Sequence, residues 1–270
     1  LINSNKIIGI DNFYSSSSFN LNQFINHKNF DFIESDISRL NNFTAKVDYI
    51  INLACPASPP IYQKDPLFTL DTNYAGTLNL LNIANSNDAI FIQASTSEVY
   101  GDPLIHPQVE DYFGNVNTMG VRSCYDEGKR ISETLCYEFR KKFNLQTRVT
   151  RIFNTYGPRM DKNDGRVISN FITNTINKSP LIIYGKGEQT RSFCYIDDLV
   201  SGIIKSMHFD FDKPINLGNN KEISLNSLAN LFLEIYGQNE IIYKEALEDD
   251  PKVRKPNISR AYRLLNWSPK

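Results

Sequence analysis

Short runs of apolar, mostly β-branched residues recur along the first part of the chain, and longer segments with helical spacing lie between the later runs. The apolar runs occupy residues 7–10, 30–33, 47–53, 89–94 and 147–153. The helical segments occupy residues 67–84 and 125–143. Buried strands that alternate with helices are typical of a parallel sheet covered by helices. The pattern therefore predicts a doubly wound α/β domain.

The pattern becomes irregular after residue 153. Residues 154–166 are rich in Gly, Pro and Asp, a helix is expected near 167–176, and a loop is expected at 184–191. Such a region is typical of a smaller substrate-binding part. A helix and an apolar strand return near 198–207 and 214–217. We therefore expect the two regions to interleave.

The composition favours a globular protein that acts on a small molecule. The 270 residues are 41% hydrophobic, and 29 basic against 30 acidic residues leave a formal charge of -1. Without an excess of positive charge, the sequence predicts no nucleic-acid partner. The four cysteines form no CxxC pair and the three histidines lie far apart. We therefore predict neither a metal site nor a disulfide framework.

No apolar run reaches the roughly 18 residues that a membrane-spanning helix needs. The N-terminus also lacks the basic-then-apolar order of a signal peptide. These features favour a cytoplasmic protein. The chain begins with Leu1 rather than Met, so an upstream leader or anchor would lie outside this sequence.

The glycine turn of a dinucleotide-binding fold is missing from the sequence. In that fold the first strand runs into GxGxxG or a related turn, and a helix N-terminus receives the pyrophosphate. Here Asp11 and Asn12 follow the apolar run 7–10, where a carboxylate about 20 residues after the glycines binds the adenosine ribose. One interpretation is that the first strand, the glycine turn and most of the first helix precede Leu1. The alternative is that Asp11 and Asn12 only open a turn.

A tyrosine and a lysine four residues apart occur twice on the same predicted helix. Tyr125 and Lys129 share one helix face, and Tyr137 and Lys141 repeat the spacing. An ammonium beside a phenol favours the ionised form, so such a pair can act as a base for a hydroxyl proton. Twelve helical positions rotate the second pair by roughly 120°, so the two pairs cannot both face one site.

Hydroxyl and carboxylate side chains follow the apolar run 89–94. Ser95, Thr96, Ser97 and Glu98 stand where ligands bind in open α/β sheets, at the carboxyl ends of the strands. The alternative is a capped turn with a solvated acid. This position favours the first tyrosine–lysine pair as the catalytic one.

Long strings of residues resemble the extended short-chain dehydrogenase/reductase family and, within it, the UDP-glucuronate decarboxylases, which are also called UDP-xylose synthases. The strings are LACPASPPIYQKDP, ASTSEVYGDPLIHPQ, GVRSCYDEGKRISETL, RIFNTYGPRM, DGRVISNFI, QTRSFCYIDDLV and VRKPNISRA. The resemblance covers nearly the whole chain and departs from the family at the absent GxxGxxG turn. It implies a partial NAD-binding Rossmann domain at 1–155 and a mainly UDP-sugar-binding region at 156–270, with about 192–217 returning to the Rossmann domain.

The resemblance also implies the reaction. UDP-glucuronate would be oxidised at C4 with catalytic NAD, lose carbon dioxide as a 4-keto intermediate, and be reduced again to UDP-xylose. Tyr125 would be the base for the C4 hydroxyl, Lys129 would lower the pKa of Tyr125 and bind the nicotinamide ribose, and Thr96 would hydrogen-bond the sugar. Glu98 would be the catalytic acid. Arg254 would hold the carboxylate region and help to protonate the enolate; alternatively, it belongs to a basic surface patch.

Binding roles are implied in the same way. Asp11 and Asn12 would bind the adenosine ribose, Asp36 the adenine edge, and the backbone of Ala54 would line the cofactor cleft. The sugar nucleotide would contact three further residues, with a charge-assisted guanidinium contact to its diphosphate. These substrate residues are Tyr62, Asn154 and, for the diphosphate, Arg191.

Two kinds of alternative stay open. Sibling nucleotide-sugar 4,6-dehydratases and 4-epimerases share the tyrosine–lysine pair, although Glu98 together with Arg254 favours decarboxylation. A non-catalytic remnant is the other alternative, because the chain has no glycine turn. The resemblance further implies a homodimer in which the helices of 67–84 and 125–143 pair with their copies.

Overall fold

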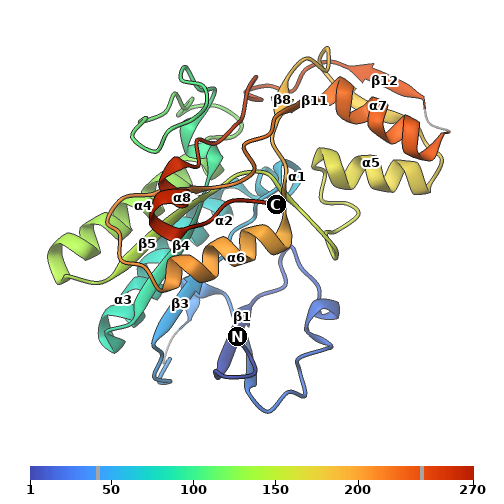
Figure 1. The fold of residues 1–270 in the computed structure, drawn as a ribbon. Helices are drawn as coiled ribbons and strands as arrows, with labels where there is room; N and C mark the ends of the chain where they lie inside the picture. Colours follow the sequence, from blue (N-terminus) through green and yellow to red (C-terminus); the bar gives the residue numbers. More distant parts are fainter. Residues whose placement is uncertain (41–42, 238–239) are drawn as a thin grey trace.

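The centre of the molecule is a parallel four-stranded sheet. A computed structural model describes residues 1–40, 43–237 and 240–270, and its ribbon shows two unequal lobes (Figure 1). In the main sheet the strand order is β10-β5-β4-β3, and all three pairings are parallel. A separate two-stranded parallel sheet contains β1 and β2. The predicted α/β fold with a doubly wound parallel sheet is therefore confirmed.

The strands and helices have the following bounds. The strands are β1 (Ile7–Asp11), β2 (Phe30–Glu34), β3 (Tyr49–Asn52), β4 (Ile90–Thr96), β5 (Thr147–Ile152), β6 (Thr155–Tyr156), β7 (Leu181–Tyr184), β8 (Thr190–Arg191), β9 (Cys194–Tyr195), β10 (Ile215–Leu217), β11 (Ile223–Ser224) and β12 (Ile241–Lys244). The α-helices are α1 (Pro59–Tyr62), α2 (Pro66–Asp71), α3 (Thr77–Asn87), α4 (Ser123–Phe143), α5 (Val167–Ile176), α6 (Ile196–Met207), α7 (Leu225–Tyr236) and α8 (Ser259–Leu265).

Helices cover the two faces of the main sheet. Successive strand residues point to opposite faces, and Ile50 and Ile51 of β3 accordingly join different apolar clusters. Ile50 packs with residues of α3 and α4, whereas Ile51 packs with residues of α6 and α8. The result is a three-layer arrangement in which both faces of each central strand are buried, as the continuous apolar runs predict.

The second lobe has its own apolar core. It combines α5 and α7 with the parallel pair β7 and β12, which lie together on one side of the main sheet (Figure 1). The chain returns from this lobe to the main sheet, because α6 packs on β5 and β10 pairs with β5. Residues after β5 therefore contribute to both lobes.

The segment predicted as one helix at 67–84 contains an irregular turn. A π-helical turn at Thr72–Gly76 joins α2 to α3. Such turns hold an extra residue within a helix and are frequent at functional sites. The turn places Asn73, which is 1% exposed, against α4, the helix that carries Tyr125. The Nδ2 of Asn73 donates to Cys55 Sγ at 3.0 Å.

Among the described residues, no helix is long and apolar enough to cross a membrane. The described part of the chain also contains no group of three or more His, Cys, Asp or Glu side chains arranged to hold a metal ion.

Candidate active site

The carboxyl ends of the central strands open onto a cavity of about 320 Å³ between the two lobes. β4 brings Thr96 to the cavity, and a short 3-10 turn at Ser97–Tyr100 follows with Glu98. The first turns of α4 contribute Tyr125 and Lys129. A volume of this size suits part of a small ligand. The residues predicted to be catalytic therefore share one cavity with Arg254, although about 150 positions separate Glu98 from Arg254 in the chain.

Tyr125 lies between a hydroxyl group and a second aromatic ring. Its phenol is hydrogen-bonded to the Thr96 side chain, and its ring stacks on Tyr62 with 5.0 Å between the centroids. The Lys129 ammonium lies 5.9 Å from the centre of the Tyr125 ring and donates to the Ala94 carbonyl at 2.9 Å. The tyrosine, the threonine and the lysine are thus assembled at the end of β4.

The protonation of Tyr125 differs from the sequence-based expectation. Burial raises the pKa of the Tyr125 phenol, the neighbouring Cys55 raises it further, and the hydrogen bond from Thr96 opposes these effects. Lys129 was expected to lower the pKa of Tyr125, but its ammonium is bound to the Ala94 carbonyl instead. The phenol is therefore neutral in the free protein, because desolvation outweighs the Thr96 hydrogen bond and the charge of Arg166.

The structure distinguishes the two tyrosine–lysine pairs. Tyr125 is 6% exposed and lines the cavity, whereas Tyr137 is 58% exposed on the surface of α4. The Lys141 ammonium lies 5.9 Å from the Tyr137 ring, the same separation as in the first pair. The local geometry is therefore the same in both pairs, and the orientation of the helix makes only one of them part of the site.

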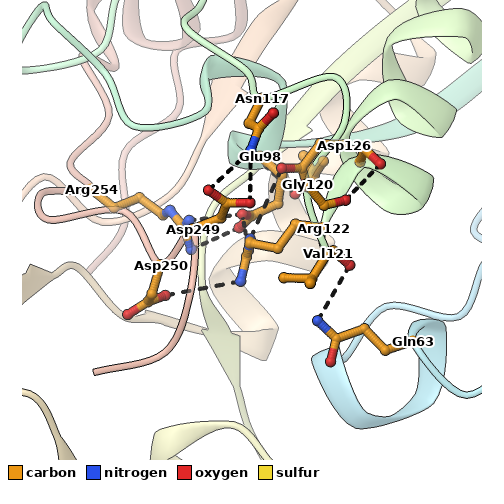
Figure 2. A network of polar contacts seen from close by, with 12 residues as sticks. Gln63, Glu98, Asn117, Gly120, Val121, Arg122, Asp126, Asp249, Asp250 and Arg254 are labelled. Atoms are coloured by element: carbon orange, nitrogen blue, oxygen red, sulfur yellow. Dashed lines mark hydrogen bonds and ion pairs between the residues drawn. The ribbon is translucent and has the colours of Figure 1, made fainter. Parts of the chain in front are cut away.

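Two arginine side chains form ion pairs with the carboxylate of Glu98 (Figure 2). Arg254 forms a two-pronged contact, with its Nη1 and Nη2 at 2.7 and 2.8 Å from Oε1 and Oε2. Arg122 donates to the same Oε2 from the start of α4. All three side chains are buried. Arg254 is therefore not part of a basic surface patch.

The ionisation of Glu98 follows from this contact. Burial alone would raise the pKa of Glu98, but the charges of Arg254 and Arg122 outweigh burial and hold that pKa below its usual value. A carboxylate in this state has no proton to donate. Glu98 is therefore an ionised carboxylate in the free protein, and its role as the catalytic acid stays a prediction.

The three substrate candidates lie around the same cavity. Tyr62, at the end of α1, is 1% exposed, and its hydroxyl oxygen has no hydrogen-bond partner among the described residues. Asn154 follows β5 and lines the cavity with its neighbour Phe153. Arg191 in β8 also lines it and forms an ion pair with Asp250 at 2.7 Å. The structure thus brings Tyr62, Asn154 and Arg191 together.

The adenosine candidates form a second group, outside this cavity. Asn12 follows β1, and its Nδ2 donates to Asp36 Oδ2 at 3.1 Å beyond the end of β2. Asp11 accepts from the Phe13 amide at 2.7 Å, which is the turn-forming contact that the alternative predicted. Ala54 follows β3 and is half-buried. Asp11 therefore forms a turn, and it also lies with Asn12 and Asp36 at the carboxyl ends of β1 and β2.

Sequence reasoning missed Arg122, Asp126 and Asp250. Arg122 approaches Asp126 and Asp250 with a nitrogen-to-oxygen distance of 3.9 Å in each case. Burial and the nearby Glu98 carboxylate raise the pKa of Asp126 to about 8, although Arg122 opposes the shift. The available signal was the charged pair Arg122 and Asp126 at one-turn spacing, on either side of Tyr125.

Comparison with known proteins identifies relatives over the whole chain. The model of the NAD dependent epimerase/dehydratase family matches residues 1–218. UDP-glucuronic acid decarboxylase 1 of Xenopus tropicalis is 46% identical over 270 residues, which are all of this chain and 64% of that protein. UDP-glucuronic acid decarboxylase 6 of Arabidopsis thaliana is 47% identical over 267 residues, or 98% of this chain and 77% of that protein.

Solved structures share the fold. A UDP-N-acetylglucosamine 4-epimerase from Methanobrevibacter ruminantium superposes with a TM-score of 0.91 at 29% identity, covering 100% of this chain and 87% of that one. A UDP-glucuronic acid 4-epimerase from Bacillus cereus, solved with UDP-glucuronic acid and NAD, gives a TM-score of 0.88 at 27% identity. It covers 97% of this chain and 85% of that one.

Proposed function

Because this chain belongs to the NAD dependent epimerase/dehydratase family, we propose that it is a UDP-glucuronate decarboxylase that forms UDP-xylose through a 4-keto intermediate. The observation that carries the proposal is the buried Glu98–Arg254 pair beside Tyr125 in one cavity. Oxidation at C4 needs a base, and removal of a carboxylate needs groups that bind an anion. This cavity holds both.

The charges of the cavity suit an anionic substrate. Three buried guanidinium groups, from Arg122, Arg191 and Arg254, line it together with the carboxylates of Glu98 and Asp250. UDP-glucuronate would bring a diphosphate and a sugar carboxylate. Buried cations that exceed their partners favour such a ligand, because charge-assisted hydrogen bonds to oxyanions strengthen where water is excluded.

The order of bond changes follows from the chemistry of the sugar. Tyr125, beside Thr96, would have to be ionised in the complex with the substrate, and the phenolate would then receive the C4 hydroxyl proton as hydride leaves C4, which gives the ketone. The C5–C6 bond then breaks, carbon dioxide departs, and the electron pair collects as an enolate conjugated with the C4 oxygen. A proton adds at C5, and reduction of the ketone completes UDP-xylose. Glu98 and Arg254 would position the carboxylate region and stabilise the developing charge.

The residues present fit the NAD that the family name implies. NAD supplies the acceptor and donor of the C4 hydride. Lys129, together with Tyr125, would bind its nicotinamide ribose, and Asp11, Asn12 and Asp36 would bind its adenosine at the ends of β1 and β2. The contact between Asn12 and Asp36 supports this assignment, because it groups polar atoms where nucleotides bind in parallel sheets. Ala54 would line the same cleft with its backbone.

A sibling 4-epimerase is the second candidate. It is supported by the fold shared with the UDP-glucuronic acid 4-epimerase of Bacillus cereus, whose printed ligands are UDP-glucuronic acid and NAD. Both reactions would begin by oxidation at C4. The Glu98–Arg254 contact favours decarboxylation, because it holds in the cavity beside Tyr125 a guanidinium that would pair with the substrate carboxylate.

The experiment is product analysis with the full-length gene product. UDP-glucuronate labelled with ¹³C at C6 is incubated with the protein and a trace of NAD, and UDP-xylose and labelled carbon dioxide are quantified. We expect both in equal amounts without net consumption of NAD. An intact hexuronate epimerised at C4 would support the epimerase instead, and recovery of unchanged substrate would support a non-catalytic remnant.

We also propose that two copies pair through the helical segments 67–84 and 125–143. We further propose a cytoplasmic location and a division of the chain at about residue 155. Leu67, Tyr74 and Tyr137 are 77, 51 and 58% exposed on this helical surface. Exposed apolar patches favour association between copies. Light scattering should give twice the monomer mass, and a monomer at micromolar concentration would contradict the pairing.

A further inference from the structure

Arg122 contacts the carboxyl groups of three residues, Glu98, Asp126 and Asp250, and so does more than add a positive charge to the cavity. It precedes the first turn of α4, three residues before Tyr125, and is 8% exposed. Its carbonyl accepts from the amides of Tyr125 and Asp126. The backbone of Arg122 is thus part of the helix that carries the base, and its side chain is fixed at the other end by Glu98.

The two arginines differ in how they are anchored. Arg122 contacts Glu98 and also approaches Asp126 and Asp250 (Figure 2). Within the described part of the chain, the ion pairs of Arg254 are with Glu98 alone. A substrate carboxylate that competes for a guanidinium would therefore displace Arg254, whose one carboxylate partner is Glu98, more easily than Arg122, which keeps Asp250 as a second anion when Asp126 is protonated.

Withdrawal of Arg254 raises a problem for Glu98 that Arg122 can solve. Glu98 is 7% exposed, and a buried carboxylate that loses its cation tends to take up a proton. Arg254 and Arg122 share Oε2 of Glu98, whereas Oε1 is bound by Arg254 alone. Loss of Arg254 thus frees one oxygen and leaves the other bound to Arg122.

We propose that Arg122 is a positioning residue that keeps Glu98 an ionised, oriented carboxylate beside Tyr125 while Arg254 engages the carboxylate of the substrate. The movement of Arg254 toward the substrate rests on the proposed function. The effect of Arg122 on the ionisation of Glu98 is a property of the free protein and can be measured without substrate.

The first experiment imitates the withdrawn state. Infrared spectra of Arg254→Met are recorded between pH 5 and 8 and compared with those of Arg254→Met/Arg122→Met, and Glu98→Gln in each background assigns the carboxylic acid band. We expect no protonated Glu98 at pH 7 when Arg122 is present and a clear band when it is replaced. Arg254→Met/Arg122→Lys, which keeps the positive charge, should lack the band. A band of equal size with and without Arg122 would overturn the proposal.

The second experiment keeps the inference testable if the double variants do not fold. The pH profile of kcat is measured for Arg122→Met and Arg122→Lys, with Arg130→Met as the control on the same helix. Arg130 binds the carbonyls of Val99 and Phe113 rather than a carboxylate of the cavity. We expect the acid limb of Arg122→Met to move upward by about one pH unit, a roughly tenfold loss below the limb, with a smaller change in KM.

The outcomes separate the two proposals. A purely structural role would lower activity at every pH without moving the limb, and this result would refute the positioning role. Arg122→Lys should restore the limb, and Arg130→Met should leave it in place. If the natural protein forms no UDP-xylose, the proposed function fails, yet the infrared titration still decides whether Arg122 controls the ionisation of Glu98.

Discussion

Replacement of Asp126 by Asn should change how the stability of the protein depends on pH. Asp126 is 6% exposed, and one of its carboxylate oxygens is buried without a hydrogen-bond partner among the described residues. Burial and the nearby Glu98 raise the pKa of Asp126 to about 8 in the folded protein. In the unfolded chain an aspartate has a pKa of about 3.9. The folded state therefore binds one more proton than the unfolded state between these two values.

The sign and size follow from proton linkage. A pKa that is raised by folding contributes stability that is fully present at low pH and is lost as the pH rises toward the folded value. Between pH 5 and 7 this one group should lower the free energy of unfolding by about 1.4 kcal/mol per pH unit, or about 2.7 kcal/mol in all. Even a folded pKa one unit lower would keep most of this range within the window.

The measurement is urea unfolding of the natural protein and Asp126→Asn at pH 5, 6 and 7. The difference in free energy between the two proteins removes the contributions of the groups that do not interact with Asp126. We expect the variant to gain about 2.7 kcal/mol relative to the natural protein across this range. Glu127→Gln, a carboxylate-to-amide change at the neighbouring half-buried residue, is the matched control. Curves for Asp126→Asn that run parallel to those of the natural protein would refute the reasoning.

Four further substitutions test the site and its support. Tyr125→Phe should abolish oxidation at C4, whereas Tyr137→Phe should keep at least half of the activity; equal losses would mean that the wrong pair was chosen. Gly128→Ala places a Cβ 2.9 Å from Asn73 Nδ2, so urea unfolding should show a loss of about 1–3 kcal/mol. A gain of about 1 kcal/mol, as helix propensity alone predicts, would contradict the tight contact. Trp267→Ala, at a side chain 2% exposed, should cost about 3–5 kcal/mol in the same assay, and a loss below 1 kcal/mol would show that the site collapses.

The elements around the site could be predicted because they are long and buried. β4 and β5 are rich in apolar and β-branched residues, and α4 repeats its buried positions at helical spacing, so each carries a signal in the sequence. The pairs β6–β9 and β8–β11 have two residues in each strand. A strand of two residues is too short to show the alternation of buried and exposed positions that identifies a strand in a sequence. β12, which has four residues, was likewise not predicted.

The ion-pair network could not be predicted from the residues alone. Arg122 lies 24 positions from Glu98, and Arg254 lies 156 positions from it. Contacts between residues so far apart in the chain produce no repeating pattern in the sequence. From the sequence alone, an arginine that pairs with a buried glutamate cannot be distinguished from an arginine exposed to solvent. The resemblance supplied Glu98 and Arg254 but gave no role to Arg122, Asp126 or Asp250. The raised pKa of Asp126 depends on burial by distant segments and becomes visible only in three dimensions.

The π-helical turn at Thr72–Gly76 has a consequence for sequence alignment. A turn of this kind absorbs one additional residue while the helices on either side keep their relative rotation. A relative that lacks the turn should therefore align with a gap of one residue inside 72–76 and with no shift in α2 or α3. The inserted residue gives Asn73 its place beside Cys55 and Gly128. Deletion of one residue within 72–76 should preserve the packing of α2 and α3 and remove only the contact between Asn73 and α4.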